Sequence, residues 1–179
     1  MRVFKYANTN LDHMTVAQDA QELLTKRKYK EASNLLDSAL AKKENDELFY
    51  LRGLVSLKLK NYDAAQEFFE RALFMKKKAE YYRAKGLAHF EIFEIDEAIT
   101  ALNHSIILEP NAIAHFFLAI GYMLLDHPNS DSHLKKAREL DPKRVKQLLF
   151  NFYSFFLETD PNLNEDQKKE IVQKIKRIS

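Results

Sequence analysis

Residues 79–111 read AEYYRAKGLAHFEIFEIDEAITALNHSIILEPN, and this stretch decides the fold. In its first half, Tyr82 and Gly86 have the i, i+4 spacing of one helix face. A glycine inside a helix costs about 1 kcal/mol relative to alanine, so we expect it to allow close approach of a second helix. The second half opens with Asp96, whose charge suits a helix N-terminus, and it ends at Pro110, which cannot continue a helix. The stretch therefore predicts two packed helices joined by a short turn.

The same pattern recurs along the chain with a period close to 33 residues. The chain has three glycines, Gly53, Gly86 and Gly121, and the pattern assigns all three to one position of the first helix. Other positions form parallel series: Ala32, Ala65 and Ala98; Leu36, Phe69, Leu102 and Leu134; Ala39, Ala72, Ser105 and Ala137. A period of this length is typical of a solenoid, in which each unit stacks on its neighbours.

These residues resemble the tetratricopeptide repeat family, whose two helices carry small and aromatic residues at matching positions. The resemblance covers residues 13–143. It implies an all-α, right-handed α-solenoid of about four helix pairs. The predicted organisation is a lead-in at 1–12, four repeats at 13–45, 46–78, 79–111 and 112–143, and C-terminal capping helices at 144–179.

The periodicity also predicts where each helix begins and ends. The expected helices are 11–26, 29–42, 46–59, 62–75, 79–92, 95–108, 112–126, 130–140 and 144–158, with a last one from Asn164 to about residue 178. The fourth repeat has 16 residues between Gly121 and Ala137, against 19 in the earlier repeats. We therefore expect an irregular turn in that repeat.

Composition narrows the function classes. The formal net charge is +2, from 28 basic and 26 acidic residues, which gives no indication of nucleic acid as a partner. Cysteine is absent, which excludes disulfides, thiol nucleophiles and cysteine metal sites. No signal-peptide core and no run of about 18 apolar residues is present. We therefore expect a soluble cytoplasmic protein with no membrane partner.

Residues that carry chemistry are scarce. All three glycines are assigned to packing, which leaves no phosphate-binding loop. The six histidines include no i, i+4 pair with a nearby acid, and we expect His89 to lie in the core. No cofactor, metal or catalytic residue is predicted, so we expect that the protein is not an enzyme.

One face of the first helices is the candidate binding site. The resemblance implies that this face lines a concave groove for peptides; the spacing shows only that its residues share a face, and some of them can instead be core. The candidate residues form three columns: Tyr50, Arg83 and Leu118; Leu54, Leu87 and Tyr122; Leu57, Phe90 and Leu125. The predicted function is an adaptor or chaperone-like scaffold that binds an apolar or amphipathic peptide segment. The alternative is a structural or self-associating subunit whose groove is filled by its own chain.

The segment Val145–Leu157, VKQLLFNFYSFFL, is apolar on all sides of a helix. Such a helix must be buried on more than one side. The residues after Pro161 are one possible cover, through Ile171, Val172, Ile175 and Ile178. The other is a second copy of the chain in a homodimer. The possible dimer surface comprises Phe150, Phe152, Tyr153, Phe155 and Phe156.

Overall fold

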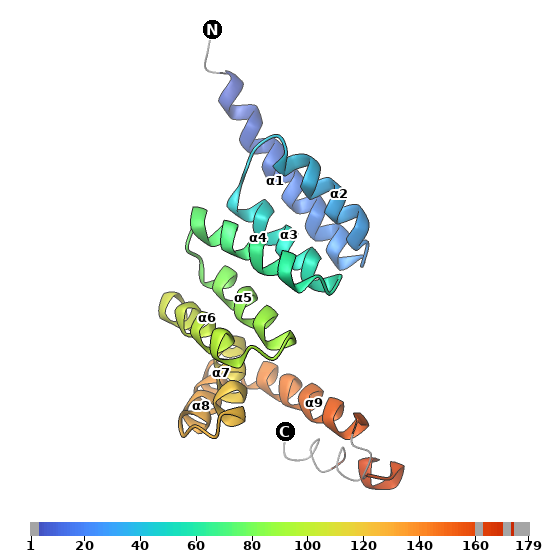
Figure 1. Ribbon diagram of the computed structural model, residues 1–179, viewed down its shortest axis with the longest axis vertical. Helices are drawn as coiled ribbons and strands as arrows, with labels where there is room; N and C mark the ends of the chain where they lie inside the picture. Colours follow the sequence, from blue (N-terminus) through green and yellow to red (C-terminus); the bar gives the residue numbers. More distant parts are fainter. Residues whose placement is uncertain (1–3, 160–162, 170–172, 174–179) are drawn as a thin grey trace. The chain divides into compact units, whose positions relative to one another are not determined.

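The computed structural model describes residues 4–159, 163–169 and 173, and the side chains of 15–154, 163–169 and 173. Within residues 4–159 it forms nine α-helices (Figure 1). They are α1 (Phe4–Thr25), α2 (Tyr29–Leu40), α3 (Asp46–Lys58), α4 (Tyr62–Met75), α5 (Ala79–Glu91), α6 (Ile95–Leu108), α7 (Ala112–Leu124), α8 (Asn129–Leu140) and α9 (Pro142–Thr159).

The helix positions follow the sequence predictions closely from α2 to α8. Each of these helices begins within one residue of its predicted start and ends within two residues of its predicted end. The first helix differs, because it begins at Phe4 and so takes in most of the segment predicted as a lead-in. Of the predicted last helix, residues 165–169 are helical, and most of its remainder lies outside the described residues.

The chain divides into two compact units, residues 1–109 and 110–179, which are described separately. In the first unit each helix from α1 to α6 packs on the next, and α3 also contacts both α1 and α5. The first helices of three successive repeats are therefore neighbours. In the second unit α7, α8 and α9 all contact one another.

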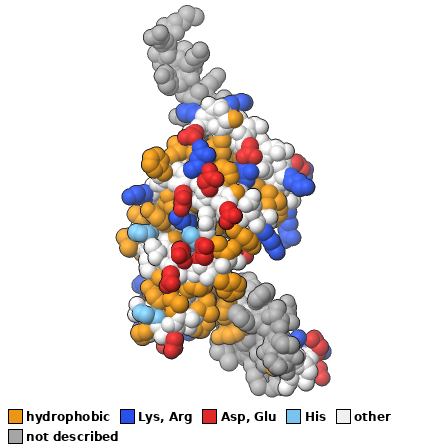
Figure 2. All heavy atoms as spheres, in the orientation of Figure 1, with side chains coloured by type: hydrophobic (Ala, Val, Ile, Leu, Met, Phe, Trp, Pro, Cys, Tyr) orange, Lys and Arg blue, Asp and Glu red, His pale blue; other side chains and the backbone are white. Residues whose placement is uncertain are grey.

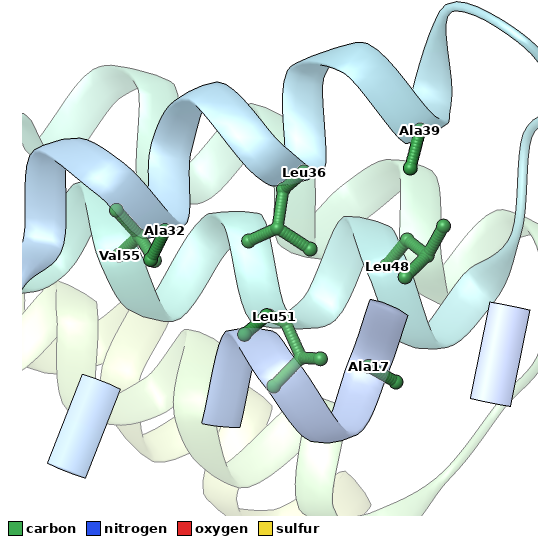
Figure 3. Packing of buried hydrophobic residues seen from close by; sticks show 8 residues of the cluster. Ala17, Ala32, Leu36, Ala39, Leu48, Leu51 and Val55 are labelled. Atoms are coloured by element: carbon green, nitrogen blue, oxygen red, sulfur yellow. The ribbon is translucent and has the colours of Figure 1, made fainter. Parts of the chain in front are cut away.

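The core of the first repeat is shared with the second. Figure 3 shows Ala17 of α1, Ala32 and Leu36 of α2, and Leu51 and Val55 of α3 gathered in one cluster. Alanines at the contact positions allow the helix axes to approach closely, while the leucines and the valine fill the space between them. Since α3 belongs to the second repeat, neither repeat can bury its apolar face alone.

Gly53 and Gly86 lie where two helices of one repeat cross. A Cβ atom on Gly53 would lie 2.5 Å from Cε1 of Phe69, and one on Gly86 would lie 2.7 Å from Cγ of Leu102. Neither glycine has a positive φ, so close packing rather than backbone conformation requires a residue without a side chain. The predicted role of these two glycines is confirmed.

A left-handed residue ends the first helix of every repeat. Positive φ angles of 51–61° occur at four positions spaced by 33 residues: Arg27, Lys60, Phe93 and Asp126. The left-handed conformation at a helix C-terminus usually falls to glycine or asparagine. The positions therefore mark the structural period independently of the glycines.

This period corrects the predicted register of the fourth repeat. Gly53 and Gly86 each lie seven residues before their left-handed residue, whereas seven residues before Asp126 is Ala119, not Gly121. Ala119 is buried, and its carbonyl oxygen accepts a hydrogen bond of 3.0 Å from Ser130 Oγ of α8. The crossing of α7 and α8 thus lies at Ala119, and the assignment of Gly121 to the glycine position is wrong. Glycine misled the alignment because alanine serves equally well there.

Phe93 offers a test of the left-handed turn. Its φ is 61° and its side chain is 81% exposed, so it carries backbone strain without contributing much packing. Because asparagine tolerates this conformation better, we expect Phe93→Asn to raise the free energy of unfolding by about 0.5–1 kcal/mol. Urea denaturation measures the change. The same substitution at Ile92, where φ is −114°, should give no such gain.

Candidate functional site

Six of the predicted site residues lie on neighbouring helices of the first unit. All six are half-buried, and with Leu24 of α1 they make up what we term the first-helix face: Tyr50, Leu54 and Leu57 from α3, and Arg83, Leu87 and Phe90 from α5. Because α3 contacts both α1 and α5, residues from the three helices can be covered by one bound segment. In Figure 2 acidic and basic side chains are interspersed with hydrophobic ones over the visible surface.

The α3 residues of this face also belong to the core. Tyr50, Leu54 and Leu57 pack against a buried cluster that includes Phe69 and Ala88. The Tyr50 ring stacks on that of Tyr81, with ring centroids 4.7 Å apart. Burial raises the pKa of the Tyr50 hydroxyl, and the charge of Glu80 adds to this effect. The interpretation of some face residues as core therefore holds in part, most clearly for Tyr50.

Arg83 is the charged residue of the first-helix face. Its neighbours are paired: Arg52 binds Asp37 with 2.7 Å between Nε and Oδ1, and Lys85 binds Glu70 with 2.8 Å between Nζ and Oε1. Within the described part of the chain, no ion pair or hydrogen bond occupies the guanidinium of Arg83. Its planar set of donors is suited to a carboxylate supplied from outside.

The predicted site residues of the fourth repeat need correction. Leu118 is fully buried, and the Tyr122 ring packs against those of His127 and His133. The period marked by Asp126 shows that the three columns were continued two residues too far along α7. The residues at the repeat positions of Arg83, Leu87 and Phe90 are Phe116, Ile120 and Met123, so Leu118, Tyr122 and Leu125 do not extend the columns.

The possible dimer surface on α9 is only partly described. Phe150 and Phe152 are half-buried and Tyr153 is exposed, while the side chains of Phe155 and Phe156 lie outside the described residues. Val145 is buried, and α9 contacts both α7 and α8. The proposed covering residues Ile171, Val172, Ile175 and Ile178 also lie outside the described part.

A polar network links the starts of α3 and α5 beneath the first-helix face. The Tyr81 hydroxyl donates to Asp46 Oδ2 at 2.8 Å, and Lys78 Nζ donates to the Tyr81 oxygen at 2.7 Å. Lys78 Nζ also lies 2.9 Å from Asp46 Oδ2. Burial alone would raise the pKa of Asp46, but the hydrogen bonds from Lys78 and Tyr81 and the charges of Lys78 and Lys76 outweigh it and lower the pKa. Sequence reasoning missed this network because its members are distant along the chain.

The network predicts an acid-sensitive contribution to stability. The lowered pKa of Asp46 means that its contribution is complete above the usual aspartate pKa of 3.8 and is lost as the pH falls through the lower folded-state value. We expect Asp46→Asn to reduce the free energy of unfolding by about 1–3 kcal/mol at pH 7. The difference from the parent chain should shrink below pH 3.8, as measured by urea denaturation at both pH values.

His89 is buried, as expected for a core histidine, and Gln66 and Glu94 contact its ring. Its Nδ1 lies 2.6 Å from Glu94 Oε2, and Gln66 Nε2 lies 3.1 Å from the same nitrogen. In the described residues, no group of three or more histidine, cysteine or acidic side chains is arranged to hold a metal ion. None of the helices described is long and apolar enough to cross a membrane.

Comparison with known proteins agrees with the repeat assignment. The family model described as a tetratricopeptide repeat matches residues 46–78, which are the bounds predicted for the second repeat. The resemblance to this family seen in the sequence is thereby confirmed. No curated protein sequence matches the chain.

Solved structures of similar fold include three that illustrate the range. MamA (41-end) from Desulfovibrio magneticus RS-1 is 24% identical, with 71% of this chain and 74% of that chain covered and a TM-score of 0.65. YrrB, described as a TPR protein with an unusual peptide-binding site, is 25% identical over 69% of this chain and 66% of its own, with a TM-score of 0.61. The APC/C hetero-tetramer Cut9-Hcn1 gives 23% identity, coverage of 76% and 29%, and a TM-score of 0.69. These similarities confirm the all-α solenoid fold.

Proposed function

Because the chain carries a tetratricopeptide repeat and has the fold of such proteins, we propose that it is an adaptor that holds a peptide segment of another protein on its first-helix face. Repeat folds of this kind support protein interaction rather than a buried reaction centre. We propose accordingly that the chain has protein partners and no catalytic activity of its own.

The half-exposed apolar columns of α3 and α5 carry this proposal. The core positions of these helices are filled by other side chains, such as Leu51, Val55 and Ala88, which are fully or almost fully buried. Leu54, Leu87 and Phe90 are therefore left partly open to solvent, although they lie next to one another along two adjacent helices. A contiguous apolar surface of this kind is typical of a site that a partner covers.

The chemistry of the face favours an amphipathic segment. Apolar side chains of the ligand would pack on Leu54, Leu87 and Phe90, either from an extended strand or from one face of a helix. An acidic side chain of the ligand would pair with Arg83. Such a pair would fix the direction of the segment, since the apolar contacts alone do not select an orientation.

Site-specific photo-crosslinking tests this proposal. A photoreactive residue at Leu87 should crosslink a partner protein in the native cell, because Leu87 lies at the centre of the first-helix face. The same residue at Ser38, on the exposed side of α2, should not. Crosslinks from Ser38 with none from Leu87 would place the partner on the second helices and contradict the proposal.

A second candidate function is a self-associating structural subunit. The observation that favours it is the exposure of Phe74 and Ile107, which are 94% and 77% exposed at the ends of α4 and α6. Two large apolar side chains in equivalent positions of successive repeats are a possible contact between copies. Solution mass at several protein concentrations separates the two functions: a tight oligomer favours the subunit, and a monomer favours the adaptor.

A further inference from the structure

Two histidines from different helices of the second unit face each other. The Nδ1 atoms of His115 on α7 and His133 on α8 lie 2.9 Å apart, and the ring centroids are separated by 5.1 Å. His115 is 8% exposed and His133 is half-buried. A hydrogen bond between two Nδ1 atoms requires one ring to carry its proton on Nδ1 and the other ring to carry its proton on Nε2.

The distance between the two nitrogens matches that of two ligands on one metal ion. An imidazole nitrogen binds a divalent transition metal at about 2.0–2.1 Å. Two such nitrogens at a right angle on the metal are separated by about 2.9 Å, whereas tetrahedral ligands are separated by about 3.3 Å. Square-planar or tetragonal coordination by nitrogen is typical of Cu(II) and Ni(II).

We propose that His115 and His133 form a two-histidine site for Cu(II), with Ni(II) binding more weakly. The metal ion replaces the shared proton between the two Nδ1 atoms, and both rings then carry their remaining proton on Nε2. No third histidine, cysteine or acidic ligand is placed at this pair in the described part of the chain, so water fills the other coordination positions. Copper ranks above nickel for nitrogen ligands in general.

The surroundings of the pair act in opposite directions. Burial lowers the pKa of both imidazoles, with smaller contributions at His115 from the charges of His133 and Lys136, so both rings are available in the neutral form that binds metal. The positive charge of Lys136, one turn of α8 from its neighbours in the pair, opposes a bound cation. The aromatic ring of Tyr122 packs on His133 and helps to fix its orientation.

Binding should join α7 to α8 and stabilise the second unit. A ligand that binds the folded chain and not the unfolded chain raises Tm as its concentration increases. Sequence spacing could not have revealed this site, because the two histidines are 18 residues apart and belong to different helices.

The test is titration of the full chain, without a histidine tag, with CuCl2 and NiCl2 by isothermal calorimetry. We expect one Cu(II) per chain, and at least tenfold weaker binding in both His115→Gln and His133→Gln, because each leaves a single ligand. The double variant should bind no more weakly than either single variant. His104→Gln, at an exposed histidine that stacks on Tyr82, is the matched control and should bind as the parent chain does.

Two further measurements do not depend on the folding of the histidine variants. Electron paramagnetic resonance of the Cu(II)-loaded parent chain should show coupling to two imidazole nitrogens, and Lys136→Gln should tighten binding. Equal binding by the parent chain and both pair variants would overturn the proposal, as would a spectrum without nitrogen coupling.

Discussion

Replacing Leu87 and Phe90 together by serine is expected to abolish capture of the partner protein while leaving the helix content nearly unchanged. Both side chains are half-buried on the first-helix face, and the buried positions of α5 are held by Tyr81, Ala84 and Ala88. The substitution therefore removes the apolar surface that a ligand would cover but leaves the interior of the repeat in place. Circular dichroism and crosslinking from an unaltered position of the face measure the two effects.

The matched control is the double substitution Phe74→Ser and Ile107→Ser. It also removes one phenylalanine and one aliphatic side chain, but from the exposed ends of α4 and α6. It should leave partner capture intact and should reduce self-association if copies meet through those residues. If the Leu87 and Phe90 variant unfolds instead, these side chains are core and the proposed binding face is wrong.

Replacing Gly86 by leucine is expected to lower the free energy of unfolding by about 1–3 kcal/mol through overpacking. The first added atom alone would lie 2.7 Å from Leu102 Cγ and 3.2 Å from the carbonyl oxygen of Ala98. The leucine side chain could rotate aside, but the carbonyl belongs to the backbone of α6, so relief requires the two helices to move apart. Urea denaturation of the parent chain and the variant measures the loss.

Two comparisons sharpen this test. Thr100→Leu, at an exposed position of α6, adds apolar volume without a crossing helix and should change the stability by less than about 0.5 kcal/mol. Ala119→Leu should be destabilising to a degree similar to Gly86→Leu, because Ala119 occupies the same crossing in the fourth repeat. Unchanged melting of the Gly86 variant would show that the helices do not approach closely at this position.

The sequence by itself determined the helices and most of their packing positions. The spacing of apolar and small residues in 79–111, repeated through the chain, predicted the bounds of α2 to α8 within two residues. It also predicted the crossings at Gly53 and Gly86 and the buried position of His89. These features follow from the sequence because helical periodicity is local, and a residue's position on a helix depends only on its distance along the chain.

Only the tertiary structure decided the features that depend on how separate helices meet. The period of the left-handed residues showed that Ala119 lies at the crossing of α7 and α8, so the fourth repeat departs from the others by one residue in its turn rather than three. The structure also brought together Asp46 with Tyr81 and His115 with His133. A single residue gained or lost in a turn shifts the register of everything after it, and residue type alone does not reveal where that shift falls. Contacts between side chains of different helices likewise depend on the packing angle and distance, which helical periodicity does not contain.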